Sequence, residues 1–173
     1  MVDAMVKWIL AGVGALLIGV FIYWQANTVK EAYVNGLAPY SQIPGRLYVF
    51  ERNCYIFKFK HHNTDYPLVG ANAPGEPMTV PALPAEVSRK FVGKDLPGVR
   101  ILDVVHTGER FRIVSVRRDT RRQVSTITFE ILLGNDEQRP YPRLDAYWIM
   151  DHAPEKDGKA PTILPGYAVE EFR

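Results

Sequence analysis

The longest apolar run in the chain extends from Trp8 to Trp24 and contains no charged residue, Asn, Gln or Pro. As a helix it rises about 26 Å at 1.5 Å per residue, close to the roughly 30 Å hydrocarbon core of a bilayer. Trp8 at one end and Tyr23 with Trp24 at the other stand where aromatic rings favour the two membrane interfaces. The run therefore predicts one transmembrane helix.

Two other interpretations compete with a transmembrane helix. A cleavable secretory signal ends in small residues, whereas this run ends in bulky ones up to Trp24. A buried helix of a globular domain normally carries a polar stripe, and this run carries none. We therefore expect an uncleaved signal anchor that continues as a helical stalk through residue 36, before a proline-containing linker at residues 37–45.

Beyond the linker, short stretches rich in aromatic and β-branched residues predict strands. Arg52 and Asn53 form a plausible turn of a hairpin between the first two strands. Three strands between residues 99 and 133, with short connections, predict an antiparallel meander. Residues 84–93, with Pro first and Gly last, predict one short helix. The predicted strands cover residues 47–51, 54–60, 99–106, 110–117, 123–133, 146–150 and 167–172, with a short edge strand near residues 78–80.

These elements predict a mainly β fold. A transmembrane helix and stalk (residues 1–36) and a linker (37–45) precede a small antiparallel β-barrel (46–152) of the SH3-like or OB-like kind. A small β-sandwich is the second choice. A proline-rich C-terminal arm (153–173) completes the chain, and the long proline-rich loops carry no sustained hydrophobic period.

The net charge of +2 is too small to indicate a partner, but basic residues concentrate in residues 86–124 and acidic residues after residue 130. Cys54 is the only cysteine, so no intrachain disulfide forms, and we expect it to be a core thiol rather than a nucleophile. A short tail before a long uncleaved helix indicates a single-pass protein of the bacterial inner membrane, with the C-terminal domain in the periplasm.

Two surfaces are candidates for binding. Small residues spaced along one face of the apolar helix allow close approach of another helix; they are Ala11, Gly12, Ala15 and Gly19. Arginines surround the turn after the second meander strand and are suited to phosphates or carboxylates; they are Arg117, Arg118, Arg121 and Arg122, backed by Arg110 and Arg112. A solvated hairpin tip is the competing interpretation of the arginines. We expect no nucleic acid partner, because no aromatic residues are interleaved with these arginines.

Candidates for metal binding and catalysis are weak. His61, His62 and Asp65 lie in one loop, but adjacent histidines lack the spacing of a tetrahedral site, and His106 and His152 are distant. Asp145, Asp151 and His152 form a candidate acid and base set with Ser115 or Ser125 as nucleophile, although neither serine has a Gly-x-Ser-x-Gly context. We predict no cofactor, no metal and no catalytic residue.

The sequence thus favours a non-catalytic accessory or scaffold subunit of a larger membrane protein complex. We expect it to contact other membrane subunits and the bilayer, docking through its helix, its β domain and its proline-rich arms, including residues 66–84 and 154–166. The alternative is a membrane-tethered module that binds an anionic lipid or envelope polymer at the arginine-rich tip. A small membrane-tethered hydrolase is the third hypothesis.

Overall fold

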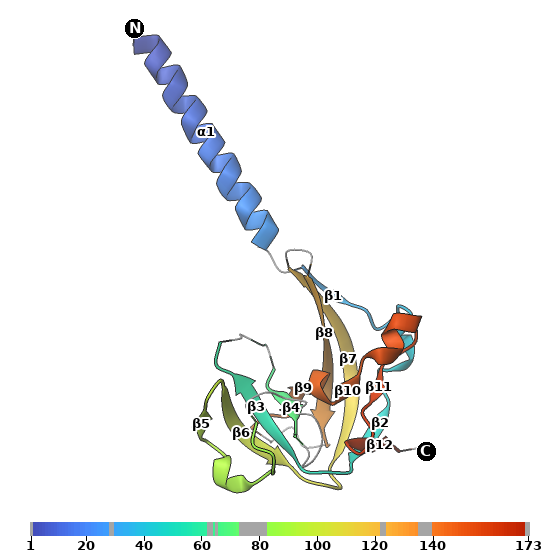
Figure 1. The fold of residues 1–173 in the computed structure, drawn as a ribbon. Coiled ribbons are helices and arrows are strands. Elements are labelled where there is room, and N and C mark those ends of the chain that lie inside the picture. Colours follow the sequence, from blue (N-terminus) through green and yellow to red (C-terminus); the bar gives the residue numbers. More distant parts are fainter. Residues whose placement is uncertain are drawn as a thin grey trace. The chain divides into compact units, whose positions relative to one another are not determined.

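A computed structural model describes residues 2–27, 30–61, 64, 66–72, 83–121, 124–134 and 140–171 (Figure 1). The chain divides into two compact units. The first, which we call the helical unit, comprises Met1–Ala32 and Asp119–Thr126. The second, which we call the β unit, comprises Tyr33–Arg118 and Ile127–Arg173.

The described residues form one α-helix, short 3-10 helices and short strands. The helices are α1 (Val2–Asn27), η1 (Tyr40–Gln42), η2 (Arg89–Phe91), η3 (Tyr147–Ile149) and η4 (Ala153–Asp157). The strands are β1 (Lys30–Tyr33), β2 (Leu47–Phe50), β3 (Cys54–Phe59), β4 (Leu68–Gly70), β5 (Asp95–Leu96), β6 (Val99–Val105), β7 (Arg110–Arg121), β8 (Val124–Leu133), β9 (Arg143–Asp145), β10 (Met150–Asp151), β11 (Thr162–Ile163) and β12 (Ala168–Glu170). The predicted mainly β content is confirmed.

The prediction of a transmembrane helix is contradicted. Within the described residues, no helix is both long enough and apolar enough to cross a membrane. The predicted signal anchor and single-pass topology are wrong for the same reason. The predicted cellular location and bilayer contact are untested and stay predictions.

The main sheet follows an open path of paired strands in the part of the chain that the structure describes. Its strands follow the order β12-β2-β7-β8-β9-β4-β3-β6-β5, with β1 paired to β7, so the described strands end at β12 and β5. Within the described residues, the strands therefore do not close into the predicted SH3-like or OB-like barrel. All strand pairs with a defined register are antiparallel except β4 and β9, which are parallel and meet at Leu68 and Asp145. A second, two-stranded sheet consists of β10 and β11.

Several predicted connections also differ from the structure. β2 pairs with β7 and β12 rather than with β3, so the hairpin around Arg52 and Asn53 does not form. β6 pairs with β3 and β5, so only β7 and β8 of the expected meander are neighbours. The helical stalk is replaced by β1, because pairing with β7 overrides the local helical pattern. The predicted edge strand at residues 78–80 lies outside the described residues.

Alternation of side chains builds two hydrophobic clusters in the β unit. The larger contains Phe50, Phe111 and Phe129, all at most 1% exposed, and the smaller contains Tyr55 and Phe57, both fully buried. β2 shows the expected period of two, with Tyr48 and Phe50 buried and the residues between them on the other face. The other face of β2 carries Leu47 and Val49, which are half-buried.

The segments predicted as extended arms contribute to the fold. In the loop after Tyr66, Leu68 and Val69 are buried in β4, and the Asn72 side chain donates a hydrogen bond to the carbonyl of Leu83 at 2.9 Å. Residues 73–82 of this loop lie outside the described residues. In the C-terminal segment, Tyr167 is 2% exposed and donates from its hydroxyl to the carbonyl of Ala71. The described parts of both arms are therefore fixed by the β unit itself.

Candidate functional site

The predicted packing face of α1 is only partly described. The side chains of Trp8 and Ala11 lie outside the described residues, whereas Gly12, Ala15 and Gly19 are exposed. A Cβ added at Gly12 or Gly19 meets no atom within 4 Å. The two aromatic residues predicted for a membrane interface are 67% exposed at Tyr23 and 64% exposed at Trp24. With no membrane-spanning helix found in the described residues, their assignment to an interface is withdrawn.

Only part of the predicted arginine-rich tip lies within the described residues. Arg117 is half-buried and Arg118 is exposed near the end of β7, whereas the Arg121 side chain and all of Arg122 lie outside the described residues. Burial raises the pKa of Tyr40, and the Glu155 carboxylate raises it further, while the Arg118 guanidinium opposes the shift. Arg118 thus lies close to two groups of the β unit rather than only to solvent.

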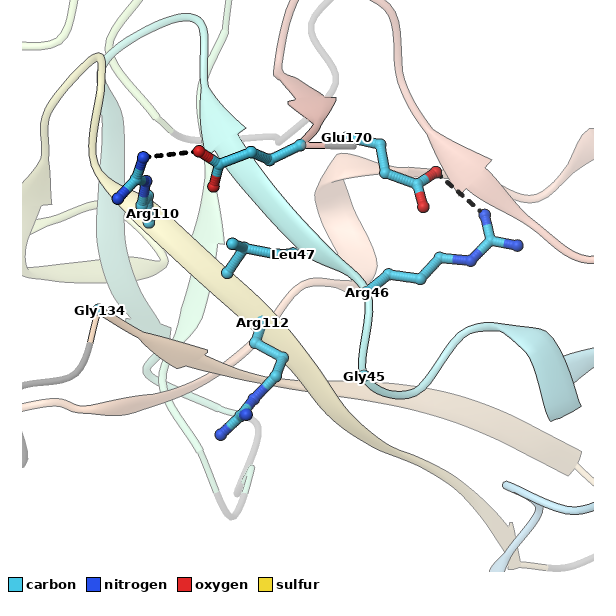
Figure 2. A pocket seen from close by; sticks show the side chains of 8 residues that line it. Gly45, Arg46, Leu47, Arg110, Arg112, Gly134 and Glu170 are labelled. Carbon is cyan, nitrogen blue, oxygen red and sulfur yellow. Dashed lines mark hydrogen bonds and ion pairs between the residues drawn. The ribbon is translucent and has the colours of Figure 1, made fainter. Parts of the chain in front are cut away.

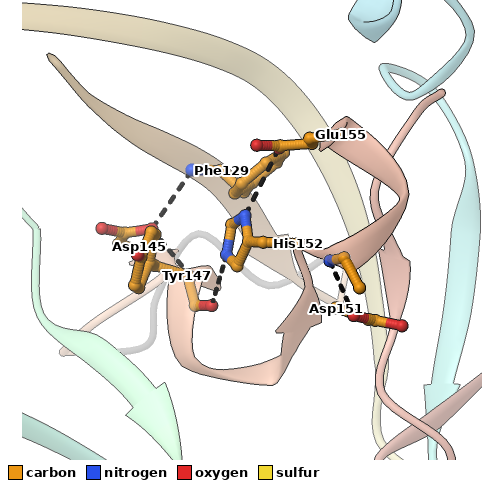
Figure 3. Close-up of polar contacts among 7 residues, drawn as sticks. Phe129, Asp145, Tyr147, Asp151, His152 and Glu155 are labelled. Atoms are coloured by element: carbon orange, nitrogen blue, oxygen red, sulfur yellow. Dashed lines mark hydrogen bonds and ion pairs between the residues drawn. The ribbon is translucent and has the colours of Figure 1, made fainter. Parts of the chain in front are cut away.

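The carboxylates considered for catalysis accept hydrogen bonds from backbone N–H groups (Figure 3). Asp145 is 7% exposed, and its Oδ1 accepts from the N–H groups of Phe129 at 3.1 Å and Tyr147 at 3.0 Å. The Oδ1 of Asp151 accepts from the N–H of Ala153 at 2.9 Å. Both carboxylates therefore hold turns in place, as capping residues do.

Among the described residues, His152 forms no hydrogen bond with Asp145 or Asp151. Its Nδ1 lies 3.3 Å from Oε1 of Glu155, and its Nε2 lies 3.3 Å from the Tyr147 carbonyl (Figure 3). Its ring also packs against the rings of Phe129 and Tyr147. The hydrogen bonds of the described residues thus link none of Asp145, Asp151 and His152 to another of the three.

The candidate nucleophiles have other partners. Ser115 is 7% exposed and donates from Oγ to Oε2 of Glu130 at 2.6 Å, and Glu130 also pairs with Arg143. The hydrogen bond from Arg143 to Glu130 raises the pKa of the guanidinium, which fixes the positive charge beside the buried carboxylate. The Oγ atoms of Ser125 and Thr120 lie 3.0 Å apart. Neither serine contacts a histidine in the described part of the chain.

Cys54 has the properties expected of a core thiol. It is fully buried, and burial raises the pKa of the thiol to about 12 despite the opposing charge of Arg52. At neutral pH the side chain is therefore a thiol and not the reactive thiolate.

In the part of the histidine loop that the structure describes, no metal site is assembled. His61 and His106 are exposed, and His62 and Asp65 lie outside the described residues. Among the residues that were described, no group of three or more His, Cys, Asp or Glu side chains is arranged to hold a metal ion.

The structure reveals one hollow that the sequence did not predict (Figure 2). It has a volume of about 420 Å³ and lies beside β2, β7 and β12. Its lining contains three arginines, two glutamates, one leucine and two glycines. These residues are Arg46, Arg110, Arg112, Glu170, Glu171, Leu47, Gly45 and Gly134.

Two of the three arginines in the hollow form ion pairs. Arg46 Nη1 lies 3.2 Å from Oε2 of Glu170, and Arg110 Nη2 lies 2.6 Å from Oε1 of Glu171 (Figure 2). Burial raises the pKa of Tyr48, with Glu170 adding to the shift and Arg46 opposing it. These groups form a charged surface on strands whose other face belongs to the core.

The third arginine, Arg112, is exposed and has no hydrogen bond or ion pair among the described residues. Arg110 and Arg112 are two residues apart on β7, so they share one face, and this spacing was the available signal in the sequence. Leu47 is the cross-strand partner of Arg112, and the Glu171 N–H donates to the Leu47 carbonyl at 2.8 Å. Three distant segments meet here, which local patterns do not reveal.

Comparisons with protein-family models, with curated proteins and with solved structures found no match to this chain.

Proposed function

We propose that this chain is a non-catalytic accessory subunit of a larger protein complex, and that α1 docks against apolar helices of another subunit. The exposure of α1 carries the proposal. Every large apolar side chain of α1 that is described is more than half exposed: Val13, Leu16, Leu17, Ile18, Val20, Phe21, Ile22, Tyr23 and Trp24, at 52–67%. A helix that is apolar on all sides is normally buried.

The hydrophobic effect supplies a large driving force for covering this helix. Burying a side chain such as Leu16 or Phe21 contributes about 1.5–3 kcal/mol. The small residues Gly12, Ala15 and Gly19 allow the backbone of a partner helix to approach closely, because interaxial distance depends on the side chains at the contact. An apolar helical surface on another protein fits both properties.

The arrangement of the polar side chains supports a non-catalytic role. Asp145 and Asp151 are bound to backbone N–H groups, and Ser115 is bound to Glu130. A catalytic base needs hydrogen-bond reach of the proton that it removes, and these groups are already used in holding the fold. The predicted anion-binding tip and the hydrolase hypothesis stay predictions, since no observation on the described residues favours either.

Site-specific photo-crosslinking of the full chain in its native cell extract tests the proposal. A benzoylphenylalanine at Leu17 or Phe21 is expected to give one discrete adduct with a protein, and the same probe at the exposed Ala85 of the β unit is expected to give none with that protein. The partner, once identified and tagged, must recover this chain in a constant ratio. Absence of a discrete protein adduct at both helix positions contradicts the proposal.

The glycine faces of α1 offer a matched pair of variants. Gly19→Leu places a bulky side chain on the small-residue face, whereas Gly14→Leu places the same side chain elsewhere on the same helix, and neither position has a neighbouring atom within 4 Å of an added Cβ. We expect the adduct to be lost in the first variant and kept in the second. Equal adduct yields in the two variants contradict docking through the small-residue face.

A further inference from the structure

We propose that the hollow beside β2, β7 and β12 binds the free C-terminal carboxylate of a peptide whose last residue is aliphatic, with Arg112 as the anchoring cation. This binding site lies wholly in the β unit and does not depend on the docking of α1. The inference therefore goes beyond the proposed function, and either can fail without the other.

Arg112 is the available cation in this hollow. Arg46 and Arg110 are held by Glu170 and Glu171, whereas Arg112 is exposed without a hydrogen bond or ion pair among the described residues. A guanidinium presents its donors in a planar fork that matches the two oxygens of a carboxylate. A ligand carboxylate is thus able to form two parallel hydrogen bonds to Arg112 without breaking the ion pair of Arg46 with Glu170 or that of Arg110 with Glu171.

The charges around the hollow select a singly charged anion. Among the described residues, three arginines and two glutamates line it, an excess of one positive charge. A carboxylate carries one negative charge and matches it. A phosphate group carries more than one at neutral pH, and Glu170 and Glu171 would repel the excess.

The neighbouring apolar surface selects the rest of the ligand. Figure 2 shows Leu47 between Arg112 and the pair formed by Arg110 and its glutamate. Val49 lies two residues along β2 and therefore on the same face, and its cross-strand partner Val169 is 48% exposed. An aliphatic side chain attached next to the carboxylate can cover this surface. The volume of about 420 Å³ is within the range of pockets that hold small ligands.

Titration of the ¹⁵N-labelled full chain, followed by nuclear magnetic resonance, tests the site with N-acetyl-leucine as the probe. The probe carries a carboxylate and an aliphatic side chain in the arrangement of a peptide C-terminus. We expect saturable shifts of the amide signals of Leu47, Arg112 and Glu171. N-acetyl-leucinamide, which lacks the charge, is expected to bind at least about tenfold more weakly. N-acetyl-glycine, which lacks the aliphatic side chain, is expected to bind more weakly than N-acetyl-leucine but more tightly than the amide.

Two variants separate the role of Arg112 from a general effect of charge. Arg112→Gln is expected to weaken binding at least about tenfold, because a charge-assisted bidentate contact is lost. Arg100→Gln, at an exposed arginine of β6 outside the hollow, is expected to leave binding unchanged. Thermal unfolding of both variants checks that the fold is retained.

Several results would overturn the proposal. These are the absence of saturable shifts, equal binding of N-acetyl-leucine and its amide, or unchanged binding by a folded Arg112→Gln variant. Inorganic phosphate that binds as tightly as N-acetyl-leucine would show a general anion site and would also overturn it. Shifts confined to α1 would contradict the site while leaving the docking of α1 intact.

Discussion

Two groups of charged side chains in the β unit differ in their degree of burial. Along β8 and β9, Glu130 and Asp145 are cross-strand partners and are 5% and 7% exposed, with each carboxylate hydrogen-bonded. Around the hollow, the side chains of Arg110 and Glu171 are 63% and 29% exposed, and Arg112 has no partner among the described residues.

This difference separates structural charges from charges available for a ligand. A buried carboxylate that loses its donors pays for desolvation, so its partners are part of the fold. An exposed ion pair contributes little to stability because water and salt screen it. Charged residue types alone do not distinguish the two groups, and burial and partners do.

The largest expected effect comes from Asp145. Replacing Asp145 with Ala leaves the N–H groups of Phe129 and Tyr147 without this acceptor in a buried site, which is expected to cost about 3–4 kcal/mol of stability. Urea unfolding at pH 7 measures the change. Asp145→Asn keeps an acceptor oxygen and is expected to lose less. A loss below about 1 kcal/mol for the alanine variant would show that this carboxylate is not structural.

A comparison of two arginines sharpens the contrast between the groups. Arg143→Gln removes the cation beside the buried Glu130 and is expected to cost about 2 kcal/mol. Arg110→Gln breaks the more exposed pair with Glu171 and is expected to cost less than about 1 kcal/mol. Unfolding of both variants in urea at low and high salt tests this order. Equal costs would contradict the role assigned to burial.

The burial of Cys54 is expected to make the free energy of unfolding depend on pH. Its pKa of about 12 in the folded chain lies above that of an exposed thiol, so the folded state holds the proton more tightly. Its contribution to stability is complete below about pH 9 and falls by up to about 1.4 kcal/mol per unit as the pH rises toward 12.

Urea unfolding between pH 8 and pH 10.5 measures this fall. Buried tyrosines such as Tyr48 and Tyr55 have raised pKa values and add a decline of the same sign. The Cys54→Ala variant isolates the thiol, because its curve is expected to be flatter than that of the unmodified chain. Parallel curves would show that the thiol is accessible to water.

The smallest effect on stability is expected at Arg112. Because this side chain is exposed and has no partner among the described residues, Arg112→Gln should change the free energy of unfolding by less than about 0.5 kcal/mol. The same variant is expected to lose binding of N-acetyl-leucine. A substantial loss of stability would place Arg112 with the structural charges and would weaken its assignment to a ligand.

Local patterns predicted the strands better than their partners. The alternation around Tyr55 and Phe57 predicted β3 to within a residue, and the run beginning at Val99 predicted β6 equally well. Such runs do not show which strands pair. The predicted pairing of β2 with β3 was therefore wrong, because β2 pairs with β7 and β12. At Lys30–Tyr33 a local helical pattern lost to pairing with β7.

The candidate site was only partly predictable. The spacing of Arg110 and Arg112 indicated a shared face, but it gave no sign that Leu47 and Glu171 would join them. Asp145 was a candidate for catalysis because sequence does not show which atoms reach a carboxylate. The backbone N–H groups that it accepts from become neighbours only after the sheet forms.

The parallel contact between β4 and β9 has a consequence for how the β unit assembles. Among the described strand pairs with a defined register it is the one parallel contact, and the strands on either side of this seam are far apart in the chain. Closing so long a loop costs entropy before the contact is made, so the seam is expected to form late in folding and to open early. Side chains on both sides of it, such as Ile56 and Phe129, belong to one hydrophobic cluster, so the junction at Leu68 and Asp145 sets when the sheet and its core become one cooperative body.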